Sequence, residues 1–222
     1  MELNQNTPSI QVVEGGGATS ASGFEAAGVT CGLKKSGNPD LALLYSRTAC
    51  KAAGTFTSNL FPAASVVLCR ERIENAAGIR AVVVNSGVAN ACTGELGMKH
   101  AREVAALAAE SLGVDESQVL SCSTGRIGVQ LPMDKLAAGI KLAAAGKTPD
   151  GGHSAALAIM TTDTRPKECA VSFTVGGRTV TVGGMTKGAG MIAPHMYPAV
   201  PHATMPAVCQ LSWGAGSRAP GR

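Results

Sequence analysis

The feature that most constrains the fold is a unit of strand, polar turn and helix that occurs twice in succession. Each unit starts with a short apolar run typical of buried strands, continues into a turn rich in serine and glycine, and ends with apolar residues at helical spacing. Strands followed by helices in this way are typical of an α/β fold. The strands are predicted at Arg80–Val84 and Val119–Cys122, the turns at Asn85–Gly87 and Ser123–Gly125, and the helices over 98–112 and 132–146.

Further strands and one more helix are predicted on either side of the two units. Val171, Phe173 and Val175 alternate with polar residues, and Gly176-Gly177 then turns the chain back toward Val180, which is the pattern of a β-hairpin. A helix is predicted over 153–160, and the downstream Pro166 prevents its continuation. The strands expected nearer the N-terminus are Leu41–Leu44, Thr55–Thr57 and Ser65–Cys69.

Composition and charge exclude several classes of protein. The formal charge of +4 comes from 19 basic and 15 acidic residues that are scattered along the chain, so no nucleic-acid-binding surface is expected. A mildly basic, solvated surface explains this charge better than attraction of an acidic substrate. The seven cysteines form no CxxC pair and are odd in number, which argues against both a disulfide framework and a metal site. No basic leader and no apolar run of about 20 residues is found, so we expect a cytoplasmic protein without membrane contact.

Four polar clusters at the ends of predicted elements are candidates for chemistry. Backbone N–H groups of Thr124 and Gly125 can stabilise the oxyanion of an acyl-transfer intermediate, whereas the alternative is that these hydroxyls cap the next helix. Lys187, between glycines, can present a cation to a carboxylate or phosphate, but its surroundings do not match a P-loop. His195 and His202 are interpreted as loop histidines because they lack further zinc ligands. The clusters are Asn85–Gly94, Ser123–Gly128, Thr161–Thr164 and Gly183–Gly190.

The chain contains four segments in the order VNSGVANACTG (84–94), STGRIG (123–128), IMTTDTRPK (159–167) and GGMTKGAGMIAPHM (183–196). Together they resemble the ornithine acetyltransferase family, the bifunctional ArgJ type. The resemblance extends over about 23–196 and includes the earlier pieces GFEAAGVTCGLK and PDLALL. It implies an α/β fold of β-sheet layers covered by helices, similar to the DmpA/ornithine acetyltransferase group.

The resemblance also implies an activity and a set of site residues. Family members are similar to N-terminal-nucleophile enzymes, in which the precursor cuts itself before a threonine that then carries the acyl group. The acetyl group passes from N-acetylornithine to glutamate, and acetyl-CoA is a possible co-substrate; no other cofactor and no metal are expected. By motif, Thr124 and Gly125 match the oxyanion-hole pair, Thr161 matches a substrate-binding threonine, and Lys187 matches the lysine that holds the substrate.

The sequence departs from the family pattern after Met196. The pattern places Ala-Thr directly after this methionine, but Pro198 occupies the expected position of the nucleophile, and Thr204 in the later triplet Ala203-Thr204-Met205 is the candidate that remains. Either the loop is lengthened and Thr204 is the nucleophile and contacts substrate, or the tail is foreign and the chain is a non-catalytic α-like subunit. The family's β-chain is missing, so a β-chain partner or self-association is expected. The expected division is an N-terminal segment (1–22), the α-chain-like domain (23–196) and a loosely ordered tail (197–222).

Overall fold

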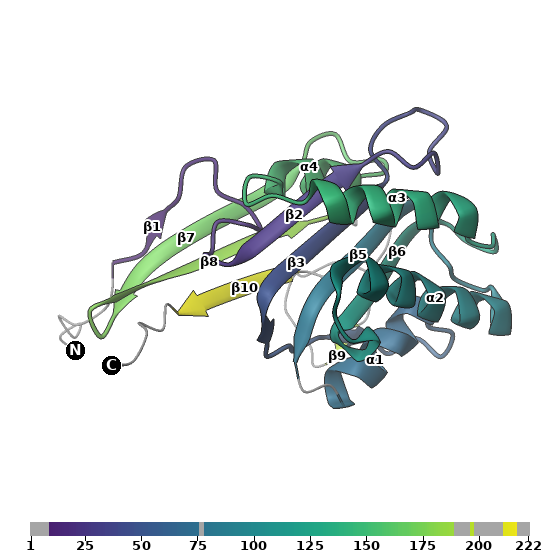
Figure 1. Cartoon of the computed structure of the whole chain (residues 1–222), viewed down its shortest axis with the longest axis horizontal. Helices are drawn as coiled ribbons and strands as arrows, with labels where there is room; N and C mark the ends of the chain where they lie inside the picture. Colours follow the sequence, from purple (N-terminus) through teal and green to yellow (C-terminus); the bar gives the residue numbers. More distant parts are fainter. Residues whose placement is uncertain (1–8, 76–77, 189–195, 198–210, 217–222) are drawn as a thin grey trace.

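The computed structural model describes residues 9–75, 78–188, 196–197 and 211–216, and builds them into two four-stranded sheets with four α-helices (Figure 1). A third, two-stranded sheet pairs β4 with β9. The strands are β1 (Gln11–Val12), β2 (Phe24–Val29), β3 (Leu41–Cys50), β4 (Phe56–Thr57), β5 (Ile79–Val88), β6 (Val119–Arg126), β7 (Lys167–Val175), β8 (Arg178–Thr186), β9 (Met196–Tyr197) and β10 (Leu211–Gly216). The helices are α1 (Ala64–Asn75), α2 (Gly94–Leu112), α3 (Met133–Gly146) and α4 (Gly152–Ala158), with a 3₁₀ turn at Glu116–Gln118.

The first sheet, which we call the helix-covered sheet, has the strand order β2-β3-β5-β6. Strands β5 and β6 are parallel and are joined through α2, whereas the other neighbours are antiparallel. Residues of one face, such as Leu43 and Val83, pack with α2 and α3. Residues of the other face, such as Leu44 and Val84, pack with α4 and with Met185 of β8. The sheet is therefore buried on both faces, which explains the continuous apolar runs of its strands.

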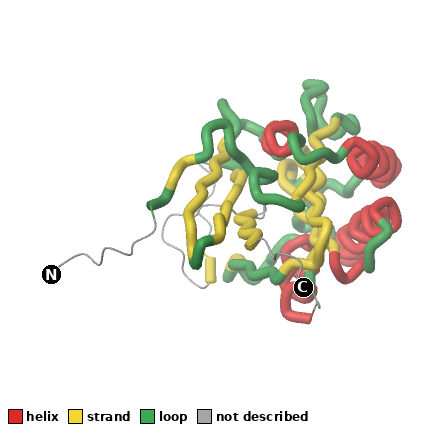
Figure 2. Tube along the Cα trace, turned by 60° about the vertical axis from the view of Figure 1, so that its left-hand side comes forward, coloured by secondary structure: helices red, strands yellow, loops and turns green. Residues whose placement is uncertain are grey.

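The second sheet, which we call the hairpin sheet, has the order β1-β7-β8-β10. Figure 2 shows it on the opposite side of the central strands from the large helices. Strand β1 belongs to the predicted N-terminal segment, and Ala18 and Ala21 of that segment are buried in the core. Strand β10 belongs to the predicted tail, where loose order was expected, and its residues Leu211–Gly216 pair with residues 180–185 of β8. The division of the chain at residues 22 and 196 stays a prediction.

The α/β class and most elements agree with the sequence prediction, but the strand predicted at Ser65–Cys69 is wrong. These residues lie in α1, whose buried positions Ser65, Leu68, Cys69 and Arg72 follow the spacing of one helical face. A short apolar run with two valines does not distinguish a strand from a buried helix segment, and here the run continues into the charged residues of a helix. Arg72 completes the face because its guanidinium donates to the backbone oxygen of Val119 and pairs with Glu116.

The two polar turns predicted after Val84 and after Cys122 are not turns in the structure. Asn85–Gly87 belong to β5 and Ser123–Gly125 belong to β6, so the strands continue through both clusters. Two of their polar side chains are paired within the sheet, since Ser123 Oγ donates to Asn85 Oδ1 (2.6 Å) and Asn85 Nδ2 donates to the Val88 oxygen (2.8 Å). The following helix α3 begins only at Met133 and has no side-chain cap hydrogen bond. The alternative that the Ser-Thr-Gly hydroxyls cap it is therefore wrong.

Candidate functional site

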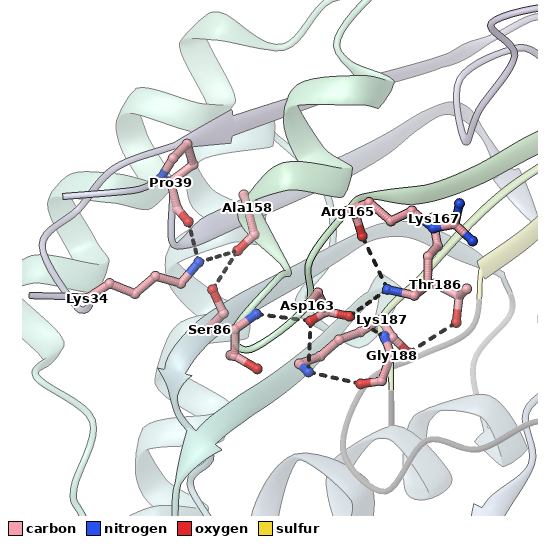
Figure 3. A network of polar contacts seen from close by, with 11 residues as sticks. Lys34, Pro39, Ser86, Ala158, Asp163, Arg165, Lys167, Thr186, Lys187 and Gly188 are labelled. Carbon is pink, nitrogen blue, oxygen red and sulfur yellow. Dashed lines mark hydrogen bonds and ion pairs between the residues drawn. The ribbon is translucent and has the colours of Figure 1, made fainter. Parts of the chain in front are cut away.

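The centre of the candidate site is the carboxylate of Asp163, in the loop between α4 and β7 (Figure 3). The side chain is 2% exposed and accepts four hydrogen bonds. Oδ1 accepts from Gly188 N (2.6 Å) and Lys167 Nζ (2.9 Å), and Oδ2 accepts from Thr161 N (3.1 Å) and lies 3.1 Å from Lys187 Nζ. Burial alone raises the pKa of the Asp163 carboxyl, but the hydrogen bonds from Lys167, Thr161 N, Lys187 and Gly188 N outweigh it and hold the pKa far below its usual range.

Lys187 directly follows β8, and its ammonium group is held between the Asp163 carboxylate and the backbone. The side chain is 10% exposed, and Nζ donates to the Gly188 oxygen at 3.0 Å. A Cβ on the neighbouring Gly188 would lie 2.5 Å from Asp163 Oδ1, so a side chain there would displace the carboxylate. The predicted cation is thus present, but it is ion-paired rather than free.

A second lysine, Lys34, lies beside this cluster on the loop between β2 and β3. Its Nζ donates to the Pro39 oxygen (2.5 Å) and the Ala158 oxygen (3.4 Å), and Ser86 Oγ donates to the same Ala158 oxygen at 2.5 Å. Burial lowers the pKa of the Lys34 amine, the negative charges of Asp40 and Asp163 oppose the shift, and the nearby positive charge of Lys187 adds to it. The Ala158 oxygen therefore links Lys34 to the end of β5.

Thr124 and Gly125 lie at the end of β6, directly beside this part of β5. Thr124 is in register with Ser86 and Gly125 with Gly87. Gly125 has a φ of +130°, and a Cβ on it would meet the Gly87 backbone carbon at 2.3 Å, so the close approach of the two strands requires glycine. Gly125 is exposed and Thr124 is half-buried, so this end of β6 reaches the surface.

The structure brings four predicted site residues to one side of the molecule. Thr161 and Lys187 share the Asp163 carboxylate, and the Thr124–Gly125 end of β6 is joined to that loop through Ser86 and Ala158. The candidate nucleophile Thr204, the departing Pro198 and the histidines His195 and His202 lie outside the described residues.

The charge of the cluster favours an anionic ligand. Lys167 and Lys187 contact the carboxylate of Asp163, and Lys34 interacts with it electrostatically. The carboxylate of Asp40 is already occupied by the backbone N–H groups of Cys31, Leu33 and Lys34. Preorganised cations and backbone donors of this kind are suited to hold a carboxylate.

Across the described part of the chain, no group of three or more histidine, cysteine or acidic side chains is arranged to hold a metal ion. Among the same residues, no helix is long and apolar enough to cross a membrane.

Comparison with protein families matches residues 25–211 of this chain to the ArgJ family. The chain belongs to the ArgJ family. An arginine biosynthesis bifunctional protein ArgJ from Symbiobacterium thermophilum is 55% identical over 183 residues, which is 82% of this chain and 45% of that protein. The corresponding protein of a Synechocystis species is 48% identical over 186 residues, or 84% of this chain and 45% of that protein. The chain thus spans about half the length of these ArgJ relatives.

Two solved structures of the ArgJ family share the fold. The ArgJ protein of Bacillus halodurans matches with a TM-score of 0.80 and 39% identity, over 86% of this chain and the whole of that chain. The ornithine acetyltransferase of Mycobacterium tuberculosis, solved with ornithine, matches with a TM-score of 0.78 and 40% identity over 85% of this chain and the whole of that chain. The expected α/β architecture and the family resemblance are both confirmed.

Sequence reasoning missed three members of the candidate site, namely Asp163, Lys34 and Ser86. Each lies in a segment that the motifs had singled out, but only as part of a polar cluster or of the matching text. A signal for Asp163 was available, because an acidic residue between threonines and before a proline is well placed to accept backbone hydrogen bonds in a turn. No local signal marks Lys34, because its role depends on a contact with Ala158 at a distance of 124 residues along the chain.

Proposed function

We propose that this chain forms the acyl-binding half of a glutamate N-acetyltransferase with ornithine acetyltransferase activity, an enzyme of arginine biosynthesis. Membership of the ArgJ family supports the reaction class. The observation that carries the proposal is the position of Lys187 and Thr161 on one buried carboxylate, on the same side of the molecule as the Thr124–Gly125 end of β6. In this proposal N-acetylornithine and glutamate are the substrates, acetyl-CoA is a possible alternative donor, and the location is cytoplasmic.

The proposed reaction has two acyl-transfer steps. The chain is first cut between Ala203 and Thr204, which frees the α-amino group of Thr204 as the base for its own hydroxyl. The hydroxyl oxygen attacks the acetyl carbon of N-acetylornithine, its proton passes through the α-amino group to the departing amine, and ornithine leaves. The amine of glutamate then attacks the ester, and N-acetylglutamate leaves as the threonine hydroxyl is restored.

Each proposed site residue has one task in this scheme. The backbone N–H groups at Thr124 and Gly125 stabilise the negative oxygen that develops in both steps, and removal of one such donor commonly costs about 3 kcal/mol in the transition state. Lys187 and Thr161 hold the α-carboxylate side of the acetylated amino acid. A carboxylate bound in a water-poor site is well matched by a preorganised ammonium group.

The direct test is incubation of the purified chain with N-acetylornithine and glutamate. We expect a mass split between Ala203 and Thr204, an acetyl group on Thr204, and release of ornithine with formation of N-acetylglutamate. The variant Thr204→Ala should abolish all three, whereas the exposed-loop variant Asp150→Asn should leave them unchanged. An intact chain that never becomes acetylated would disprove catalysis by this chain.

A residue of the sequence, Pro198, supports a second candidate, a non-catalytic α-like subunit that needs a β-chain partner. Proline has no hydroxyl group, and Pro198 stands where the family pattern has its nucleophile. In this case the chain binds N-acetylornithine without turnover, alone or as a self-associated form. Activity that appears only after addition of the C-terminal half of a full-length relative would support this candidate over the first.

A further inference from the structure

The buried carboxylate of Asp163 has no task in the proposed reaction. Its four donors come from two separate parts of the chain. Thr161 N and Lys167 belong to the segment around the loop itself, whereas Lys187 and Gly188 belong to the end of β8. The carboxylate therefore fastens the end of β8 to the loop that follows α4.

We propose that Asp163 is a positioning residue that fixes the Lys187 ammonium group for an incoming carboxylate. The identity of that ligand rests on the proposed function, but the positioning itself does not. Both oxygens of Asp163 are occupied by donors, so the side chain has little capacity left to bind a ligand directly. Lys187 has four flexible side-chain bonds, and the carboxylate together with the Gly188 oxygen restricts it to one geometry.

Charge balance is the competing role for Asp163, and the two roles predict opposite signs. If Asp163 only compensates the positive charge of Lys34, Lys167 and Lys187, its removal makes the site more positive and should strengthen the binding of an anion. If Asp163 positions Lys187, its removal releases the ammonium group and should weaken the same binding, because a displacement of about 1 Å is enough to lose a precise contact.

The experiment compares Asp163→Asn with Asp150→Asn in the whole chain. Both variants remove one negative charge, but Asp150 is exposed in the turn before α4, whereas Asp163 lies in the loop after that helix. The ligand is N-acetyl-L-norvaline, which carries the acetyl group and an α-carboxylate but no side-chain charge. By calorimetry we expect Asp163→Asn to raise its Kd at least about tenfold, and Asp150→Asn to change it less than about twofold. Unchanged or tighter binding in Asp163→Asn would overturn the proposal.

A double-mutant cycle with Lys187→Gln shows whether the effect passes through Lys187. In the Lys187→Gln background, Asp163→Asn should change the Kd by less than about twofold, because the group that it positions is gone. A further loss as large as in the wild-type background would mean that Asp163 acts on the ligand by another route.

Circular dichroism and urea unfolding confirm that each variant is folded. If Asp163→Asn does not fold, Asp163→Glu replaces it: this variant keeps the charge but displaces the carboxylate, so weaker binding supports positioning and unchanged binding contradicts it.

A readout without any ligand separates this proposal from the proposed function. The ammonium proton signal of Lys187 can be recorded by ¹H–¹⁵N NMR and assigned with Lys187→Gln. We expect it to be protected from exchange in the wild type and in Asp150→Asn, and lost in Asp163→Asn. If the wild type bound no N-acetyl amino acid but this pattern held, the proposed function would fail while the positioning role stood. If the signal persisted in Asp163→Asn, the positioning role would fail whatever the ligand.

Discussion

The helix-covered sheet and the hairpin sheet have the same number of strands but are stabilised differently. Eight of the ten residues of β5 are buried, against one of nine in β7. Helices pack on one face of the first sheet, and the other face meets α4 and β8. The hairpin sheet instead keeps most side chains half-buried or exposed and depends on its ladders and turns. The environment should therefore change the reactivity of side chains more in and around the first sheet than in the second. Substitutions should likewise lower the free energy of unfolding more in the first sheet than in the second.

The largest difference is expected between two thiols, Cys31 after β2 and Cys169 on β7. Burial and the neighbouring Asp40 carboxylate raise the pKa of the Cys31 thiol from 9.0 to about 12, whereas Cys169 is exposed. Alkylation requires the thiolate, so three pH units correspond to about a thousandfold lower reactivity than that of an ordinary thiol. Iodoacetamide labelling at mildly alkaline pH, followed by peptide mass spectrometry, should modify Cys169 long before Cys31. In concentrated urea the two rates should become similar, and similar rates in the folded protein would contradict the comparison.

A glycine contact in the helix-covered sheet gives the largest expected loss of stability. Gly28 of β2 lies against α4 so closely that a Cβ would meet the Ser154 backbone oxygen at 1.9 Å. Gly28→Ala should therefore lower the free energy of unfolding by about 3 kcal/mol or more, because the helix has to move. The matched control is Gly146→Ala at the end of α3, where a Cβ would meet no atom within 4 Å. Urea unfolding should show no loss in the control, and a tolerated Gly28→Ala would mean that α4 is free to shift.

The same contrast explains how much of the fold was predictable from sequence. Periodicity found α2, α3 and the β7–β8 hairpin, because each repeats its pattern over several residues, and α4 was also predicted. It misassigned Ser65–Cys69, where five residues are too few to separate a strand from a helix and tertiary burial decides. It also placed turns at Asn85–Gly87 and Ser123–Gly125, because serine and glycine are usual in turns, whereas here they serve the close approach of two parallel strands.

The candidate site was predictable only where it coincides with motifs. Lys187 was found from its glycine-rich loop and from the family resemblance, and Thr161 from the resemblance alone. Both contact one carboxylate in the structure. The carboxylate itself, Asp163, was not identified, because nothing in the order of residues shows that Gly188 would return 25 residues later to donate to it. Contacts of this length depend on the packing of the hairpin sheet against the core, which local patterns do not encode.

Truncation of one valine in each sheet compares how tightly the two sheets are packed. Val83 at the centre of β5 is 1% exposed, whereas Val171 of β7 is half-buried. We expect Val83→Ala to lower the free energy of unfolding by about 2–3 kcal/mol, and Val171→Ala by less than about 1 kcal/mol, because only the first leaves a closed cavity. Equal losses in urea unfolding would show that the hairpin sheet is covered on its open face by a part of the protein that packs as tightly as the helices do.

The contact between the loop that follows α4 and the end of β8 should weaken in acid, because it depends on the ionised carboxylate of Asp163. The pKa of this carboxyl is lowered in the folded protein from the ordinary 3.8, so its ionised form stabilises the fold at every pH above that value. The contribution is lost as the pH falls below 3.8 toward the folded-state pKa. At neutral pH we expect Asp163→Asn to lower the free energy of unfolding by about 1–2 kcal/mol, and the gap to the wild type to narrow as the pH drops. If the difference in free energy of unfolding between the two proteins did not change with pH, the ionised carboxylate would not stabilise this contact.

The smallest effect is expected at the turn of the β7–β8 hairpin. Gly176 and Gly177 both have positive φ, +56° and +73°, as in the two-residue turns that match the twist of a hairpin. A Cβ on Gly176 would meet no atom within 4 Å, so a substitution there tests backbone conformation alone. Asparagine tolerates this conformation, and Gly176→Asn should change the free energy of unfolding by no more than about 0.5 kcal/mol. Valine does not, and Gly176→Val should lower it by about 1–2 kcal/mol. If both variants were neutral in urea unfolding, the turn would contribute nothing to the register of the hairpin, and the ladder alone would hold β8 in place to present Lys187.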